Sequence, residues 1–256
     1  MSGDTPRFVA IASGKGGVGK TWLAITLAHA LVRAGRRILL FDADVGLANV
    51  DVQLGLMPSV DLGAVLSGTT GIMGAAVRHE TSGVEVLAGR SGSGALSGLS
   101  AGALELVLTQ LRAETTHYDT VLLDLSAGIE RVPRRIAAWA DLLLVVATDE
   151  PTSLTDAYAV LKLQSLDRPG ADARIVVNQA TSMAAGQATY ATLRRACMSF
   201  LHRDPPLAGI IRHDPKVRDA IRRQTPLLLR HPNCPAAEDV DALARTMRVP
   251  TGLEAR

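Results

Sequence analysis

Two lysines in a glycine-rich stretch near the N-terminus are the residues best placed to do chemistry. The chain has only four lysines, Lys15, Lys20, Lys162 and Lys216, and two of them fall within six residues of each other. The stretch 14–21 reads GKGGVGKT, which fits the spacing G-x-x-x-x-G-K-[ST] of a phosphate-binding loop. Glycines let such a loop bend so tightly that consecutive N–H groups point at phosphate oxygens. The spacing therefore predicts a site for the phosphates of a nucleotide.

Each residue of this loop has an expected role. The backbone donors to the phosphates are Gly14, Gly16, Gly17, Val18 and Gly19. Lys20 is expected to neutralise charge on the β- and γ-phosphates, and Thr21 to offer its hydroxyl to Mg²⁺. A helix that begins here adds the positive end of its dipole. We therefore expect ATP and Mg²⁺ as cofactors.

Three aspartates at the ends of two apolar runs complete the predicted chemistry. Asp42 and Asp44 follow the run 37–41, and Asp124 closes the run 121–123. Two carboxylates after a strand could be ordinary surface charges. Beside a phosphate loop, one carboxylate can support Mg²⁺ while another orients the water that attacks the γ-phosphate. Asp124 has the place of a Walker B residue, which binds Mg²⁺ through water.

Short apolar runs alternate with longer amphipathic runs, and this alternation must position the site. The runs expected to form strands are 8–12, 37–41, 84–88, 120–123, 142–147, 174–177 and 207–211. The runs with helical spacing are 20–33, 101–113, 152–165, 187–201, 215–224 and 236–247. Continuous Val, Ile, Leu and Ala runs are typical of strands buried on both faces, and the alternation gives a mainly parallel sheet.

We therefore expect an α/β chain that forms a single domain, 1–256, with the three-layer αβα P-loop NTPase fold. Ligands of such a fold bind outside the carboxyl ends of the strands, where the residues above fall. The Gly- and Ser-rich stretch at about 89–102 is expected to be a mobile surface loop, because the strand–helix alternation resumes after it.

Composition excludes several other classes of protein. The net charge of the 256 residues is only +2, so no strong field draws the chain to nucleic acid or to a membrane. No apolar run approaches the roughly 18 residues of a membrane span, and the N-terminus lacks a signal-peptide pattern. Cys197 and Cys234 lie in no metal-ligand spacing, which indicates two reduced thiols. We expect a cytoplasmic protein.

The loop with its second lysine resembles that of the deviant-loop ATPases of the MinD/ParA class, whose pattern is KGGxGK[ST]. One lysine is enough to hold the phosphates, so Lys15 has another role or is a solvated loop charge. The resemblance implies that Lys15 reaches across an ATP-bound homodimer to the partner's ATP. It further implies that Lys15, Lys20 and Asp44 are catalytic, with Asp44 positioning the water and Asp42 on the magnesium side.

The same resemblance gives roles to residues at other strand ends. Gly128, after Ala127, is expected to sense the γ-phosphate, and Glu150 to lie near the nucleotide at the dimer interface. Asp156 is expected on the face that partners sense, although a plain helix-surface charge fits it nearly as well. Asn178 can read the adenine edge through its paired donor and acceptor groups, or it is an ordinary turn residue.

The stretch 42–51, DADVGLANVD, resembles the DADLGLANVD of the flagellar-number regulators of the FlhG or FleN type. The run 150–153 and the proline-containing segment 220–237 favour the same group, and the resemblance extends from about residue 7 to residue 247. Two residues expected at the nucleotide depart from the family. Trp22 replaces Thr, Ser or Asn, and Arg212 replaces a common proline, so their contacts with the nucleotide should differ.

The expected function is that of an ATPase acting as an ATP-dependent dimer switch, which limits flagellar number or placement. Its expected partners are a second copy, and a signal-recognition-type GTPase or a flagellar transcription regulator. Only about six residues precede the first expected strand, however, and related proteins stimulate such a GTPase through a longer N-terminal extension. We therefore expect GTPase stimulation to be weak or absent.

Two alternative functions stay open at the level of sequence. A ParA-like partition ATPase would bind DNA nonspecifically through the arginines 194, 195, 203, 218, 222 and 223, although solvated helix faces explain these residues more simply. A MinD-like ATPase would position the division site. Direct membrane binding should be weak or absent, because few large apolar residues follow Met247 and the stripe before it is typical of core. Any location at the pole or membrane should then depend on a protein partner.

Overall fold

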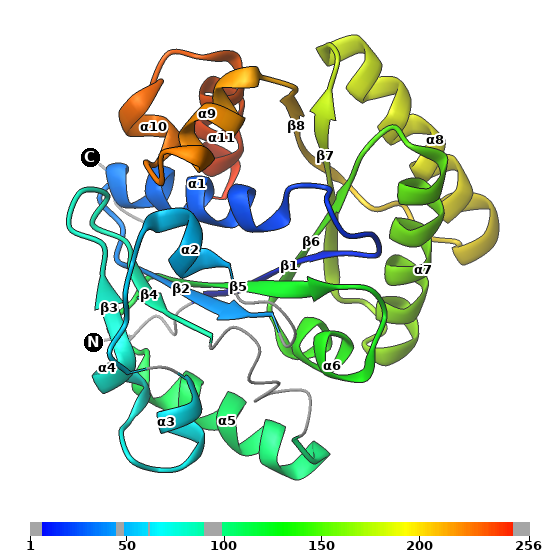
Figure 1. Cartoon of the computed structure of the whole chain (residues 1–256). Coiled ribbons are helices and arrows are strands. Elements are labelled where there is room, and N and C mark those ends of the chain that lie inside the picture. The colour runs from blue at the N-terminus through cyan, green and yellow to red at the C-terminus, as the bar shows by residue number, and fades with distance from the viewer. Residues whose placement is uncertain (1–6, 45–48, 61, 90–98, 248–256) are drawn as a thin grey trace, which may run out of the picture.

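The computed structural model describes residues 7–44, 49–60, 62–89 and 99–247. Within these ranges one eight-stranded sheet crosses the molecule, with the strand order β3-β4-β2-β5-β1-β6-β7-β8 (Figure 1). The strands are β1 (Arg7–Ser13), β2 (Ile38–Ala43), β3 (Ala76–Arg78), β4 (Glu85–Leu87), β5 (Thr120–Ala127), β6 (Leu142–Ala147), β7 (Asp172–Ala180) and β8 (Leu207–Arg212). All neighbouring pairs are parallel except β3 with β4, so the mainly parallel sheet is confirmed.

Helices cover both faces of the sheet, so the predicted three-layer fold is confirmed (Figure 1). One layer holds α1 (Lys20–Arg33), α2 (Val50–Leu54), α9 (Pro215–Arg222), α10 (Leu227–Arg230) and α11 (Pro235–Thr246). The other layer holds α3 (Leu62–Leu66), α4 (Ile72–Ala75), α5 (Ala101–Glu114), α6 (Arg131–Trp139), α7 (Pro151–Asp167) and α8 (Met183–Leu201).

The central strand β1 shows why a strand buried on both faces consists of a continuous apolar run. Phe8 and Ala10 belong to the core on one face, whereas Val9 and Ile11 belong to the core on the other. Successive side chains of a strand point to opposite faces, so a strand between two helix layers has no face left for polar residues. β1 lies between β5 and β6, which places the loop that follows it near the middle of the sheet edge.

The C-terminal apolar stripe is part of the core, as predicted. Val240, Leu243 and Met247 are all less than 5% exposed, and α11 packs on α1 and β8. The tail after Met247, the residues before β1 and most of the expected mobile loop, at 90–98, lie outside the described residues.

Several short elements were not predicted. β3 and the helices α2, α3, α4 and α10 are only three to five residues long, too short to show a period. α6 is longer but carries three arginines on its exposed side, so its apolar positions are few. Its buried residues are Val132, Pro133, Ile136 and Ala137, which fill the space between the sheet and α7.

Candidate nucleotide-binding site

The glycine-rich loop joins the carboxyl end of β1 to the first turn of α1. Gly17 and Gly19 have φ angles of 79° and 88°, a region that favours glycine. Gly19 is the N-cap of α1, where no side chain accepts the first N–H groups and the first turn holds no acidic residue. Helix N–H groups without acceptors, together with the helix dipole, form an anion site. The loop therefore has the form that phosphate binding requires.

Two glycines of the loop are required by close neighbours. A Cβ at Gly14 would lie 2.4 Å from the carbonyl oxygen of Asp156 in α7, and a Cβ at Gly19 would lie 2.5 Å from Nδ2 of Asn178. Asn178 is buried, and its Nδ2 donates to the carbonyl oxygen of Val18 at 2.7 Å. The end of β7 thus holds the loop from one side, and the contact of Asn178 with adenine stays a prediction.

Asp42 and Asp124 meet next to the loop, on the neighbouring strands β2 and β5. They are register partners, and each is only 1% exposed. Burial, together with the charge of Asp42, raises the pKa of Asp124 to about 7, while a hydrogen bond from Thr21 and the charge of Lys20 act in the opposite direction. Oδ1 of Asp124 is buried and has no hydrogen-bond partner among the described residues. Two desolvated carboxylates with an unsatisfied oxygen fit a divalent cation.

No group of three or more His, Cys, Asp or Glu side chains within the described ranges is arranged to hold a metal ion by itself. Mg²⁺ keeps several waters and commonly binds through one or two carboxylates together with substrate phosphates. Thr21, Asp42 and Asp124 thus stay the predicted share of the protein in a magnesium site next to the phosphate loop.

Asp42 also has a structural role that the sequence did not reveal. Its Oδ1 accepts the backbone N–H of Asp44 at 3.1 Å, and its Oδ2 accepts those of Asn49 and Val50 at 2.9 and 3.0 Å. Burial raises the pKa of Asp42 to about 6, against the lowering effect of these hydrogen bonds. Asp42 thereby holds both Asp44 and the start of α2 in place beside the loop.

Lys15 does not lie over its own loop but points to the start of α7. Its Nζ forms an ion pair with Glu150 and donates to Oγ1 of Thr152 at 3.0 Å. The side chains of Lys15 and Glu150 are 36% and 59% exposed, so the pair lies at the surface. The structure therefore pairs, within one protomer, two residues that were each expected at a dimer interface, and the sequence analysis did not predict this contact.

Gly128 directly follows β5, the strand that pairs with β1 on the side opposite β6. Its N–H donates to the carbonyl oxygen of Ser13 at 2.9 Å, its φ is 105°, and no atom lies within 4 Å of a Cβ built there. This places Gly128 beside the first residues of the loop with open space on its Cα. Its contact with the γ-phosphate stays a prediction.

The side chains of Trp22 and Arg212 are engaged by other parts of the protein. Trp22 is 7% exposed and packs in the core between α1, α2 and α10. Nε and one terminal nitrogen of Arg212 donate to the two carboxylate oxygens of Asp239 at 2.8 and 2.9 Å, which ties β8 to α11. The contacts of Trp22 and Arg212 with a nucleotide stay predictions.

Comparison with known proteins agrees with this site. The family described as the CobQ/CobB/MinD/ParA nucleotide binding domain matches residues 9–227. The antiactivator FleN of Pseudomonas aeruginosa is 35% identical over 240 residues, which cover 93% of this chain and 85% of FleN. The flagellum site-determining protein YlxH of Helicobacter pylori is 28% identical over 240 residues, which cover 93% of this chain and 80% of YlxH.

A similar solved structure is that of the septum site-determining protein MinD of Pyrococcus horikoshii, complexed with Mg-ADP. It has a TM-score of 0.79 and 25% identity, and the match covers 98% of this chain and 99% of that chain. The fold and the loop define a P-loop ATPase with ATP and Mg²⁺ as cofactors. The chain belongs to the CobQ/CobB/MinD/ParA family, and within it resembles the flagellar regulators, as predicted. No helix in the described part of the chain is long and apolar enough to span a membrane.

Proposed function

We propose that this protein is an ATP-driven dimer switch that limits the number of flagella or fixes their placement. The observation that carries the proposal is the second loop lysine, Lys15, which lies at the surface and turns away from the magnesium side of its own loop. The similarity to FleN over 93% of the chain supports the flagellar part. The switch then has two states, a separate protomer and an ATP-bound pair.

Within one protomer the chain's own groups bind and orient the reactants. Lys20 is buried beside Asp124 and supplies positive charge to the phosphates, and Thr21 lies on the magnesium side. When bound, Mg²⁺ would neutralise charge that develops on the phosphate oxygens. Asp44 stands two residues after Asp42, with its backbone N–H fixed by that residue. A carboxylate held there can accept a proton-bearing water and orient it for attack.

The Lys15–Glu150 pair explains how one lysine can change partners. A salt bridge between half-exposed side chains contributes little to stability, since water screens it and solvates both groups well. Lys15 can therefore leave Glu150 at small cost when a phosphate of a second protomer offers more negative charge. We infer that Glu150 holds Lys15 in a waiting position at the rim of the site, and that dimer formation replaces this contact.

The proposed partners are a flagellar transcription regulator or a signal-recognition-type GTPase, and the proposed location is the cytoplasm, with recruitment to the pole by such a partner. The apolar stripe of α11 is buried against α1 and β8 and is not available to a lipid surface. A helix binds a membrane through an apolar face that it can insert.

The test is complementation in a flagellated host that lacks its own FleN-type regulator. Wild-type protein should restore the normal number of flagella per cell, as counted by electron microscopy, whereas Lys15→Ala and Asp44→Ala should not. Lys216→Ala, which changes an exposed lysine outside the site, is the matched control. Full complementation by Lys15→Ala would contradict the switch, and failure of the wild-type protein to restore the normal number of flagella would contradict the flagellar assignment.

A ParA-like function in DNA binding has less support from the structure. Two of the six arginines considered for it form ion pairs, Arg194 with Asp204 and Arg223 with Asp219, a carboxylate that Arg230 shares. ATP-dependent binding to random duplex DNA that weakens steeply with salt would favour this alternative. A MinD-like function would instead be revealed by misplaced division septa in cells with altered levels of the protein.

A further inference from the structure

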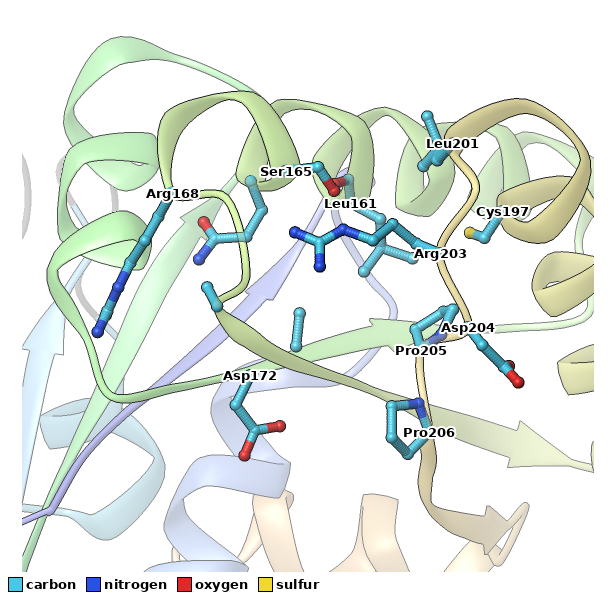
Figure 2. Close-up of a pocket in the computed structure, with 13 residues that line it drawn as sticks. Leu161, Ser165, Arg168, Asp172, Cys197, Leu201, Arg203, Asp204, Pro205 and Pro206 are labelled. Atoms are coloured by element: carbon cyan, nitrogen blue, oxygen red, sulfur yellow. The ribbon is translucent and has the colours of Figure 1, made fainter.

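A second hollow, whose lining residues are drawn in Figure 2, lies at the opposite end of the sheet from the glycine-rich loop. It opens between α7 and α8, next to the first residues of β7 and the prolines that precede β8. The hollow has a volume of ≈ 140 Å³ and adjoins an open groove of ≈ 550 Å³ along the ends of the same two helices. The two share Ser165, Leu201 and Arg203, so we treat them as one, the α7–α8 groove.

The outer part of the α7–α8 groove is apolar and exposed. Phe200 near the end of α8 is 74% exposed, and Leu166 of α7 is 67% exposed. Both line this part of the groove together with Pro169 and Gly170. Covering large apolar side chains is favourable by about 25 cal/mol per Å² of apolar surface, and exposed apolar patches rimmed by polar residues mark interaction sites.

The inner part of the groove carries a guanidinium without a counter-charge. The Arg203 side chain extends across the hollow toward α7 (Figure 2). Two aspartates also border the hollow, but both are neutralised from outside: Asp172 by Arg174 at 2.7 Å and Asp204 by Arg194 at 2.6 Å. Neither Arg203 nor Lys162, which lines the outer part, forms an ion pair with any residue in the described ranges. The groove therefore presents net positive charge beside an apolar surface.

We propose that the α7–α8 groove binds a short segment of a partner protein in which an acidic side chain stands next to large apolar ones. The carboxylate would meet the Arg203 guanidinium, whose fork of donors matches two carboxylate oxygens, with Lys162 at the rim. The neighbouring apolar side chains would cover Phe200 and Leu166. The proposal does not depend on the flagellar assignment, because it rests on the shape and charge of the groove alone.

The position of the groove leaves the nucleotide site free. The loop lies at the carboxyl ends of the parallel strands, whereas Asp172 and Pro206 border the groove at their amino ends. α7 connects the two regions, since Thr152 near its start contacts Lys15 and Ser165 near its end lines the groove. Because the groove and the loop lie at opposite ends of the strands, a bound segment is expected to leave nucleotide affinity intact, which separates a fault in the groove from a fault in the ATPase.

The test uses random short peptides displayed on phage as the probe. Peptides are selected on the full wild-type chain and counter-selected on a Phe200→Ser/Arg203→Gln double variant. The expected winners carry Asp or Glu beside Leu, Ile, Phe or Trp. In fluorescence polarisation, Arg203→Gln, Phe200→Ser and Leu166→Ser should each weaken the best peptide by about tenfold or more, as residues at the centre of an interface do. ATP affinity of the same variants serves as the folding control.

The matched controls are Arg195→Gln on α8 and Leu106→Ser on α5, a leucine that is 73% exposed far from the groove along the chain. Both should leave the affinity within about twofold, as surface changes outside an interface do. Failure to enrich any peptide dependent on Phe200 and Arg203, or enrichment of basic peptides, would overturn the proposal. So would equal losses in the control variants, or an Arg203→Gln variant that loses binding to duplex DNA or anionic vesicles instead of to peptide.

Discussion

At the scale of single residues, the charged residues of the site are held by contacts of different kinds. Lys15 is held by Glu150, Asp44 by the carboxylate of Asp42 through its N–H, and Asp124 by Thr21. Because these contacts differ in burial, they should respond differently to substitution. The half-exposed Lys15–Glu150 pair can exchange partners, whereas the buried Asp42 and Asp124 define a fixed point beside the loop.

The first prediction concerns Lys15. In Lys15→Ala the loop keeps its backbone donors and Lys20, so nucleotide affinity should stay within a few-fold while ATP-dependent dimerisation is lost. Light scattering coupled to size exclusion would measure the mass with ATP, and a fluorescent ATP analogue would measure affinity. Lys216→Ala should behave as wild type. An ATP dimer of normal stability in Lys15→Ala would mean that the lysine is a solvated loop charge.

The second prediction separates binding from hydrolysis. Asp44→Ala should reduce the ATPase rate by on the order of 10²-fold and leave an ATP-bound dimer that persists, because orienting the water matters in the transition state and little in the ground state. Lys20→Ala should instead lose affinity for ATP. Phosphate release and nucleotide binding measured on both variants distinguish the two roles, and unchanged turnover in Asp44→Ala would assign that carboxylate a structural role only.

At the scale of elements, α1 must present its N-terminus to phosphate while its other residues are buried in the core. His29 on this helix is 2% exposed, and its Nδ1 has no partner among the described residues. Burial, with the positive charge of Arg33 and the nearby His79, lowers the pKa of His29 to about 4. A neutral histidine is thus buried in the very helix that starts at the phosphate loop.

The third prediction is that His29 contributes a destabilising effect on mild acidification. The ordinary pKa of histidine is 6.5, whereas that of His29 in the native chain is about 4. Between these two pH values the unfolded chain therefore binds a proton at His29 and the native chain does not. The contribution of His29 to the free energy of unfolding should therefore decrease by on the order of 3 kcal/mol as the pH falls across this window, while the raised pKa values of the buried Asp42 and Asp124 act in the opposite direction. Urea unfolding of wild type and His29→Leu would measure it as the difference between their two pH dependences, because the variant lacks the contribution of His29. His117→Leu, at an exposed histidine, is the control, and identical slopes in all three proteins would refute the assignment.

At the scale of the whole molecule, the strand order decides which segments meet at the site. β1 lies between β5 and β6, so the loop after β1 meets Gly128 after β5 and the Glu150 segment after β6. β2 lies on the far side of β5 and contributes Asp42, and β7 contributes Asn178 from beyond β6. Ligand binding here should therefore stabilise the sheet as a unit.

The fourth prediction is a ligand-dependent melting temperature. ATP with Mg²⁺ at 100 times the dissociation constant should add about 2.7 kcal/mol to the free energy of unfolding and raise the melting temperature. Adding EDTA should remove part of this gain, because the carboxylates of Asp42 and Asp124 then face the phosphates without a cation. Lys20→Ala should show little shift at the same ATP concentration. A shift insensitive to both EDTA and Lys20→Ala would place nucleotide elsewhere.

The sequence by itself determined the class of fold and the location of the phosphate loop. Continuous apolar runs and helical periods act locally, so α1 and β6 were predicted with the bounds that the structure has. The loop spacing is likewise a local requirement of phosphate binding, which is why Gly14 to Thr21 and the strand-end aspartates could be found without a structure. Short elements such as α2 and β3 were not predicted, because a few residues are too short to show a helical or strand period.

Only the tertiary structure decided which side chains share a contact. Lys15 and Glu150 are 135 positions apart in the sequence, and Arg212 and Asp239 are 27 positions apart. Over such separations the spacing of residues does not predict a contact. The same holds for Trp22, whose burial depends on α2 and α10 packing over it, and for the α7–α8 groove, which exists only where two helix ends and two strand starts come together. The spacing of residues along the chain determines local features such as the phosphate loop, whereas the order of the strands in the sheet determines which distant residues come into contact.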